Sequence, residues 1–159
     1  MASFFRANEI ATIAVEIEKK GREFYLSLEK SATNPKTREL FHYLANEEAK
    51  HQGIFQSLAK RLGEIELPAW ATSEEYGAYI QGLIESHALF TDQDSDLKAA
   101  VVDNEKAAVR MAMSFEKDTL LFFMEMETFV PDTEKDAVRE CIQEERVHLS
   151  KLQAIYSQL

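Results

Sequence analysis

The chain has 159 residues, with 28 Asp or Glu against 18 Lys or Arg and a formal net charge of −10. This acidic balance argues against nucleic acid or an anionic membrane as a partner, because both need a basic protein surface. The one cysteine, Cys141, excludes an intramolecular disulfide framework and any cluster held by four thiolates of one chain. No apolar run approaches the roughly 20 residues of a membrane span, and no signal-peptide core precedes Arg6. We therefore expect a cytoplasmic protein.

Apolar residues recur at alternating steps of four and three, the period of an amphipathic helix, along four long segments. The predicted helices cover residues 8–32, 35–62, 104–129 and 133–157. Asn34 before Pro35 is typical of an N-cap followed by a first-turn proline, and Gly63 suits a helix end.

The connection between the second and third long helices is too long for a plain loop. It is predicted to hold a shorter helix over residues 73–90, with Thr72 and Glu75 forming a capping box at its start. Two hairpins of long helices joined by one long crossover describe an all-α, ferritin-like four-helix bundle. We expect residues 1–159 to form one such domain.

An internal repeat relates the two hairpins. The segment EKKGREFY at 18–25 is similar to EKDTLLFF at 116–123, and EEAKH at 47–51 is similar to EERVH at 144–148. Glu116 follows Glu18 by 98 residues and Glu145 follows Glu48 by 97, so the two copies are almost in register. The chain therefore reads as two copies of one helical hairpin.

Each long helix carries one glutamate inside its apolar stripe, and two of these glutamates begin a Glu-x-x-His pair. The six polar residues that interrupt the stripes are Glu18, Glu48, His51, Glu116, Glu145 and His148. A Glu-x-x-His pair puts both side chains on one helical face, about one turn apart. The pattern predicts that four carboxylates and two imidazoles meet in the middle of the bundle.

Four buried carboxylates need a cation. Burying one ionised carboxylate without a partner costs several kcal/mol, and the whole stability of a domain is only about 5–15 kcal/mol. Lys and Arg fall mostly on the outer faces of the helices, whereas two divalent metal ions would neutralise the four charges. A mixed set of oxygen and nitrogen ligands favours iron or manganese.

Other candidate residues fit this pattern less well. Glu47 and Glu144 recur one residue off the stripe, and we interpret them as groups behind the ligands or facing solvent. His42 is predicted on the surface, and His87 is predicted as a satisfied core or interface histidine. Glu85 lies beside the crossover stripe but in the wrong helical position for an extra ligand.

The pattern of one in-stripe Glu followed by Glu-x-x-His, given twice, resembles the di-iron ferritin-like superfamily. The "Glu-Lys-x-x-x-x-Phe-Tyr" and "Glu-Glu-x-x-His" segments most resemble the rubrerythrin family. This resemblance implies that Glu48 and Glu145 bridge or shift between two irons, with one His on each iron. It makes Glu18 and Glu116 terminal ligands. Tyr25 matches a tyrosine near the di-iron centre and is the candidate catalytic residue.

The chain departs from the rubrerythrin pattern at two places and from the bacterioferritin pattern at a third. Rubrerythrins carry a C-terminal rubredoxin domain, so a separate donor such as a rubredoxin-like protein is expected to supply electrons here. Met113 stands where rubrerythrins have an extra carboxylate that helps a ligand switch during turnover. Ala49 stands where bacterioferritins have their haem-binding methionine, so no haem is expected.

The leading hypothesis is a homodimeric, non-haem di-iron oxidoreductase that reduces hydrogen peroxide or O2 in oxidative stress defence. The resemblance implies two Fe ions per chain, with Mn as a possible substitute. One alternative keeps the centre but makes the protein a ferroxidase or iron-handling ferritin. Another is a non-enzymatic helical module that binds a partner, against which the two intact ligand sets argue.

Overall fold

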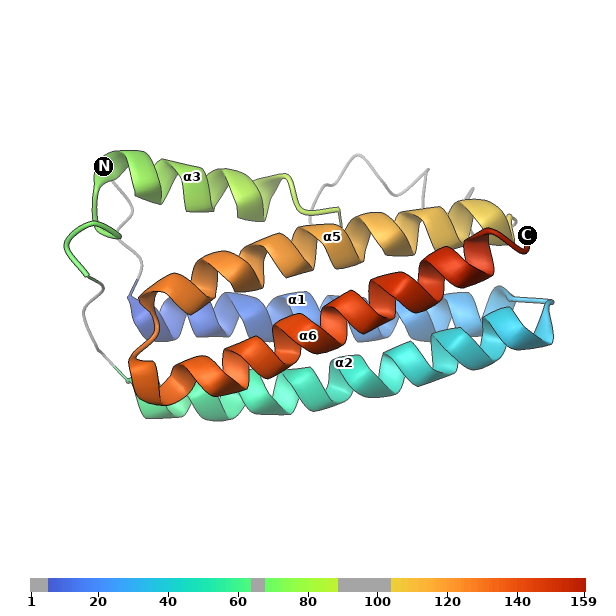
Figure 1. Cartoon of the computed structure of the whole chain (residues 1–159), viewed down its shortest axis with the longest axis horizontal. Coiled ribbons are helices and arrows are strands. Elements are labelled where there is room, and N and C mark those ends of the chain that lie inside the picture. The colour runs from blue at the N-terminus through green and yellow to red at the C-terminus, as the bar shows by residue number, and fades with distance from the viewer. Residues whose placement is uncertain (1–5, 64–67, 89–103) are drawn as a thin grey trace.

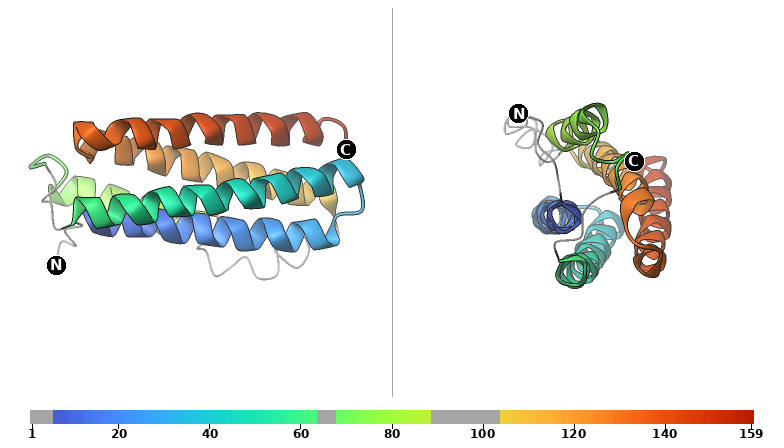
Figure 2. Two further views of the ribbon diagram at one scale, coloured as in Figure 1. Left: turned by 90° about the horizontal axis from the view of Figure 1, so that it is seen from below. Right: turned by 90° about the vertical axis from the view of Figure 1, so that its left-hand side faces the viewer.

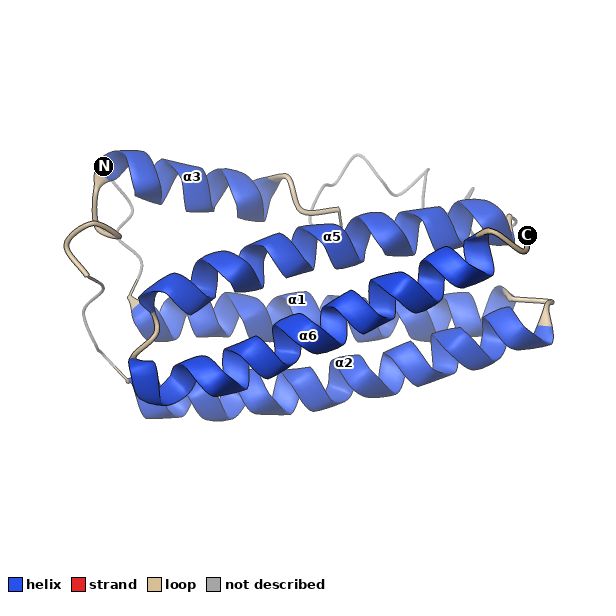
Figure 3. Ribbon diagram, in the orientation of Figure 1, coloured by secondary structure: helices blue, strands red, loops and turns tan. Residues whose placement is uncertain are grey.

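The computed structural model describes residues 6–63, 68–88 and 104–159, and every regular element in these ranges is a helix (Figure 3). The four long helices are α1 (Ala7–Ser31), α2 (Pro35–Leu62), α5 (Glu105–Phe129) and α6 (Asp132–Tyr156). A shorter helix, α3 (Glu74–Glu85), lies in the crossover between α2 and α5. The predicted all-α class is confirmed, and the long helices begin and end within one residue of the predicted positions.

The long helices form two antiparallel hairpins that pack face to face (Figures 1 and 2). Helix α1 packs mainly on α2, and α5 packs mainly on α6. The hairpins meet through α2 against α6 and α1 against α5, while α3 lies outside the bundle against α5. This is the ferritin-like arrangement in which side chains of all four helices can reach one central volume.

The helix ends follow the sequence signals closely. Asn34 caps α2 by accepting hydrogen bonds from the backbone N–H groups of Lys36 and Thr37, and Gly63 ends the helix with a φ of 52°. The predicted cap of the crossover helix is one residue off, because the Ser73 hydroxyl accepts from the N–H of Tyr76. Thr72 instead donates its hydroxyl to the carbonyl of Ala69.

The crossover helix is also shorter than expected. It ends at Glu85, where Ser86 caps the last turn with its backbone N–H, whereas the prediction continued to residue 90. Residues 89 and 90 lie outside the described part of the chain. The apolar stripe of this helix is carried past its end by His87, which is buried.

The apolar core runs along the whole bundle. Its largest fully buried side chains include Tyr25, Phe41, Phe55, Phe115 and Phe123. Gly21 is required in this core, because a Cβ atom there would lie 2.5 Å from Cζ of Phe115 and 2.8 Å from Oε2 of Glu48. Within the described residues, no helix combines the length and apolarity needed to cross a bilayer.

Candidate metal centre

The six polar residues that interrupt the apolar stripes come together in the middle of the bundle. Helices α1 and α5 each bring one glutamate, and α2 and α6 each bring a glutamate and a histidine one turn later. We call this set the carboxylate–histidine cluster: Glu18, Glu48, His51, Glu116, Glu145 and His148. All six side chains have 0% relative exposure, so the cluster is sealed from bulk water.

The cluster consists of two overlapping groups of four. One contains Glu18, Glu48, His51 and Glu145, and the other contains Glu48, Glu116, Glu145 and His148. Within each group, one possible ligand atom per residue lies within 4.8 Å of the others. Glu48 and Glu145 belong to both groups. The geometry is that of two adjacent cation positions that share two carboxylates.

Both imidazoles turn Nδ1 toward the carboxylates. Nδ1 of His51 lies 2.8 Å from Oε1 of Glu145 and 3.4 Å from Oε2 of Glu18. Nδ1 of His148 lies 3.1 Å from Oε2 of Glu145 and 3.8 Å from Oε1 of Glu48. The two rings stack with centroids 5.6 Å apart. Glu145 thus contacts both imidazoles, while Nε2 of each ring faces away from the cluster.

The electrostatics of the cluster are those of crowded, desolvated carboxylates. Burial, followed by repulsion from Glu18 and Glu145, raises the pKa of Glu48 well above its ordinary value. Burial and the charge of Glu145 likewise raise the pKa of Glu116 well above its ordinary value. Without metal, these groups therefore resist ionisation.

Glu145 and His51 form the ionised part of the cluster. Burial alone would raise the pKa of Glu145, but hydrogen bonds with Glu116 and His148 bring it below its ordinary value. Burial alone would lower the pKa of His51, but the carboxylates of Glu145 and Glu18 raise it well above its ordinary value. The metal-free cluster therefore combines protons with an ion pair to limit its charge.

The donor set fits a pair of divalent cations. Both oxygens of Glu18 and of Glu48 are buried without a hydrogen-bond partner among the described residues. Oε2 of Glu116 is in the same state. None of the four carboxylates pairs with a Lys or Arg among the described residues. Such orphaned groups are costly unless a cation satisfies them, and oxygen with imidazole ligands suits iron or manganese.

Tyr25 reaches the cluster from α1. Its hydroxyl donates a hydrogen bond to Oε1 of Glu116, and its ring is fully buried between Phe41 and Phe115. Burial and the nearby charge of Glu116 raise the pKa of this phenol well above its ordinary value. Tyr25 therefore stays protonated beside the cluster.

Glu144 and Glu47, which the repeat makes equivalent, behave differently. Oε2 of Glu144 lies 2.6 Å from Nε2 of His51. Glu47 instead forms an ion pair with Lys50 on the same helix. The sequence indicated a place behind the ligands or toward solvent for both residues, and only the structure distinguishes them.

The remaining singled-out residues lie outside the cluster. His42 is on the surface as predicted, against Glu29, and Glu85 is exposed and bonded by Gln81. His87 is a buried, satisfied histidine as predicted, with Nε2 3.0 Å from the hydroxyl of Thr119.

Two sulfur side chains lie about one turn before cluster residues on their helices without belonging to the cluster. Met113 packs, partly buried, against the apolar core. Cys141, on α6 one turn before Glu145, is fully buried, and burial raises the pKa of its thiol to about 12.

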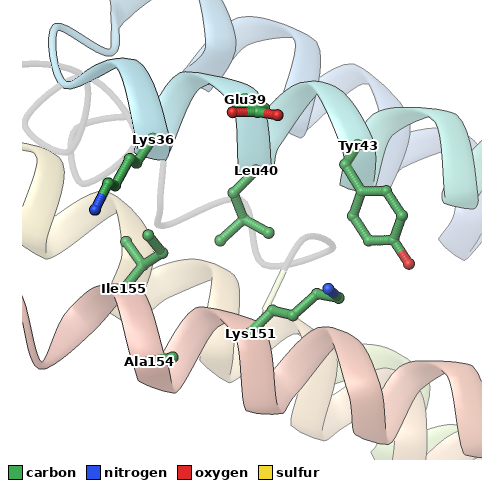
Figure 4. A pocket seen from close by; sticks show the side chains of 7 residues that line it. All are labelled: Lys36, Glu39, Leu40, Tyr43, Lys151, Ala154 and Ile155. Atoms are coloured by element: carbon green, nitrogen blue, oxygen red, sulfur yellow. The ribbon is translucent and has the colours of Figure 1, made fainter.

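A groove of about 380 Å³ opens between α2 and α6. Its lining residues are Lys36, Glu39, Leu40, Tyr43, Lys151, Ala154 and Ile155 (Figure 4). The ring of Tyr43 stands perpendicular to that of His148 with centroids 6.0 Å apart. Tyr43 therefore separates the cluster from this groove.

Comparisons with known proteins agree with this geometry. A family model described as Rubrerythrin matches residues 9–156. A protein from Thermotoga maritima described as a ferritin-like diiron-carboxylate protein superposes with a TM-score of 0.76 at 22% identity, covering 99% of this chain and 98% of that one. A protein from Pyrococcus furiosus superposes with a TM-score of 0.66 at 21% identity, covering 96% of this chain and 89% of that one. No curated protein matches the chain significantly.

The two solved structures establish likeness of fold, and the family model covers almost the whole sequence with all six cluster residues inside it. The chain is therefore a member of the rubrerythrin family, with a ferritin-like fold and a buried carboxylate–histidine cluster suited to iron.

Proposed function

We propose that this protein is a di-iron oxidoreductase that reduces hydrogen peroxide to water with electrons from a separate donor. The observation that carries the proposal is the pair of overlapping ligand groups sharing Glu48 and Glu145. Glu18 and His51 would complete one metal position, and Glu116 and His148 would complete the other. A pair of ferrous ions held there would supply the two electrons that, with two protons, convert one peroxide into two waters.

The chain's own contribution begins with position and charge. Four helices hold the six side chains in a rigid, fully buried set, so little reorganisation is needed when charge changes at the centre. The four carboxylates would neutralise two divalent ions, which favours retaining them. The apolar walls formed by side chains such as Phe41, Phe55 and Phe115 limit escape of reactive oxygen species.

Tyr25 is the residue best placed to hold a proton beside the cluster. Its hydroxyl is protonated and already donates to Oε1 of Glu116, a member of the cluster. It can hold a proton at the phenolic oxygen and orient Glu116. We therefore keep Tyr25 as the candidate catalytic residue.

Iron content and stoichiometry test the proposal. Protein purified without oxygen and loaded with Fe(II) should bind two irons per chain, one for each ligand group. It should then oxidise two Fe(II) for each peroxide consumed and turn over when a reduced rubredoxin is added. Glu116→Gln should lose iron and turnover, whereas Glu85→Gln, which changes an exposed carboxylate, should keep both. Unchanged iron binding in Glu116→Gln would refute the ligand assignment.

The same experiment separates the proposed activity from iron storage. A protein that instead oxidises Fe(II) with O2, takes up iron far beyond its ligand groups and assembles into a large cage would be an iron-handling ferritin. A small oligomer, such as the homodimer we propose, that turns over peroxide supports the oxidoreductase. Light scattering and iron uptake measured on one sample distinguish the two.

A further inference from the structure

The two histidines of the cluster have matching inner sides. Each turns Nδ1 toward shared carboxylates, and both lie close to Glu145, at 2.8 Å for His51 and 3.1 Å for His148. Nδ1 is therefore the ligand atom of both rings, and Nε2 is the outer nitrogen. Whatever contacts Nε2 controls the tautomer, the orientation and the electron donation of the ligand ring.

The outer sides differ. Nε2 of His51 lies 2.6 Å from the carboxylate of Glu144, whose side chain is 40% exposed. Nε2 of His148 is buried and has no hydrogen-bond partner within the described part of the chain. The ring of Tyr43 lies perpendicular to that of His148 with centroids 6.0 Å apart, and it offers an aromatic ring rather than a carboxylate.

The internal repeat explains why the two Nε2 atoms have different neighbours. Glu47 immediately precedes Glu48 as Glu144 precedes Glu145, so Glu47 is the residue that corresponds to Glu144. Three residues after Glu47 comes Lys50, which holds its carboxylate in an ion pair. Three residues after Glu144 comes Val147, an exposed side chain with no charge to offer. In the first repeat, Lys50 forms an ion pair with Glu47. In the second repeat, no lysine stands at the corresponding position, and Glu144 contacts His51 instead.

We infer that Glu144 is a positioning residue that makes the His51 half of the centre the tighter metal position, and that Lys50 leaves the His148 half the weaker one. The inference rests on the proposed metal centre. A carboxylate behind a ligand histidine fixes the ring with its lone pair toward the metal and makes it a better donor, and losing such a partner typically lowers metal affinity by about 10–100-fold.

Titration of the metal-free, full-length chain with Co(II) tests the inference without any turnover. Wild type should bind two ions in separate steps, followed by calorimetry and by the visible absorption of Co(II). Glu144→Gln should weaken the first step by about 10–100-fold. Glu47→Gln, the matched control, should leave both steps unchanged. Because Glu144 is part-exposed, thermal unfolding of metal-free Glu144→Gln should match wild type, which separates positioning from a structural defect.

Exchanging the residues that differ between the repeats gives a second, independent test. Val147→Lys should draw Glu144 away from His51 and weaken the first step as Glu144→Gln does. Lys50→Val should free Glu47 and bring the two affinities closer together.

Three results would overturn the inference. One is Glu144→Gln binding like wild type, and another is Glu47→Gln weakening binding as much as Glu144→Gln. In both cases, binding of two ions by the wild-type protein would still agree with the proposed function. Failure of wild type to bind any Co(II) or Fe(II) would overturn the proposed function as well.

Discussion

The two helical hairpins carry the same ligand residues in different surroundings. Burial and the neighbouring carboxylates raise the pKa of Glu48, whereas hydrogen bonds with Glu116 and the two imidazoles bring the pKa of its counterpart Glu145 below its ordinary value. Glu116 accepts a hydrogen bond from Tyr25, whereas no described residue donates a hydrogen bond to either oxygen of its counterpart Glu18. An internal repeat can thus preserve the donor set while the neighbouring positions decide which donors are charged.

The difference extends to the residues one and two turns further along α1 and α5. Gly21 corresponds to Thr119, whose hydroxyl lies against Nε2 of His87. Tyr25 corresponds to Phe123, whose ring packs on that of Phe55 with centroids 4.7 Å apart. Among the described residues, the first hairpin therefore supplies a hydroxyl to the cluster through Tyr25, and the second receives a buried imidazole, His87, from the crossover. Changing one member of each pair tests whether these differences are functional.

The largest contrast is expected between Glu48→Gln and Glu145→Gln. At neutral pH and without metal, Glu48→Gln should stabilise the fold by about 1 kcal/mol or more, because it removes a carboxylate whose ionisation is unfavourable. Glu145→Gln should destabilise it by about 3–5 kcal/mol, because it leaves buried imidazoles without their partner. Urea unfolding of the metal-free proteins measures both.

Metal should reverse the order of stability, so that wild type becomes more stable than Glu48→Gln. With Fe(II) at a hundred times Kd, wild type should gain about 2.7 kcal/mol for each site. Glu48→Gln should gain much less, since Glu48 belongs to both ligand groups. Equal gains in the two proteins would contradict a shared role for Glu48.

His87 gives a pH-dependent contrast. Burial, aided by the charge of Lys20, lowers its pKa to about 4 from 6.5. The pKa of His87 is lower in the folded protein than in the unfolded chain. The contribution of neutral, buried His87 to folding stability is therefore fully present above pH 6.5 and is lost as the pH falls toward 4. Over that window wild type should lose up to about 3 kcal/mol more than His87→Gln.

Unfolding free energies at several pH values measure this difference, and subtracting the variant removes the contribution of the carboxylates. His42→Gln, which changes an exposed histidine, should follow the wild-type curve.

Gly21→Ala should destabilise the protein by about 1–3 kcal/mol, although alanine is the better helix former. The added Cβ would meet Cζ of Phe115 and Oε2 of Glu48, neither of which can move away within the core. Gly53→Ala is the control, since a Cβ there meets nothing within 4 Å, and it should stabilise by about 0.5–1 kcal/mol. The same sign for both variants would show that the core near Gly21 is looser than described.

The smallest effect is expected from Tyr25→Phe, at about 1–2 kcal/mol in the metal-free protein. The change leaves Oε1 of Glu116 buried without its donor. Tyr79→Phe removes a hydroxyl that reaches Glu125 at the surface, and it should change stability by less than about 0.5 kcal/mol. Thermal unfolding of both variants makes the comparison.

The sequence predicted the bundle well because helical periodicity and caps such as Asn34 are local signals. It also identified the six cluster residues, because a glutamate in an apolar stripe is conspicuous wherever the helix packs. The sequence did not decide whether Thr72 or Ser73 caps α3, because both adjacent residues cap well.

The different roles of Glu47 and Glu144 could not be predicted in the same way. They depend on which partner each carboxylate reaches, and Nε2 of His51 lies on another helix. The hydrogen bond of Tyr25 to Glu116 likewise joins α1 to α5. Such contacts require the packing of helices in space, which a one-dimensional pattern does not contain.

The buried position of Cys141 has a practical consequence for this protein. With a thiol pKa of about 12, the reactive thiolate is almost absent at neutral pH, so the sulfur resists alkylation and oxidation while the bundle is closed. A maleimide can react only when α6 separates from its neighbours, and a metal tied to all four long helices would make that separation rarer. The labelling rate of this one thiol therefore reports how often α6 separates from the bundle, with and without bound metal.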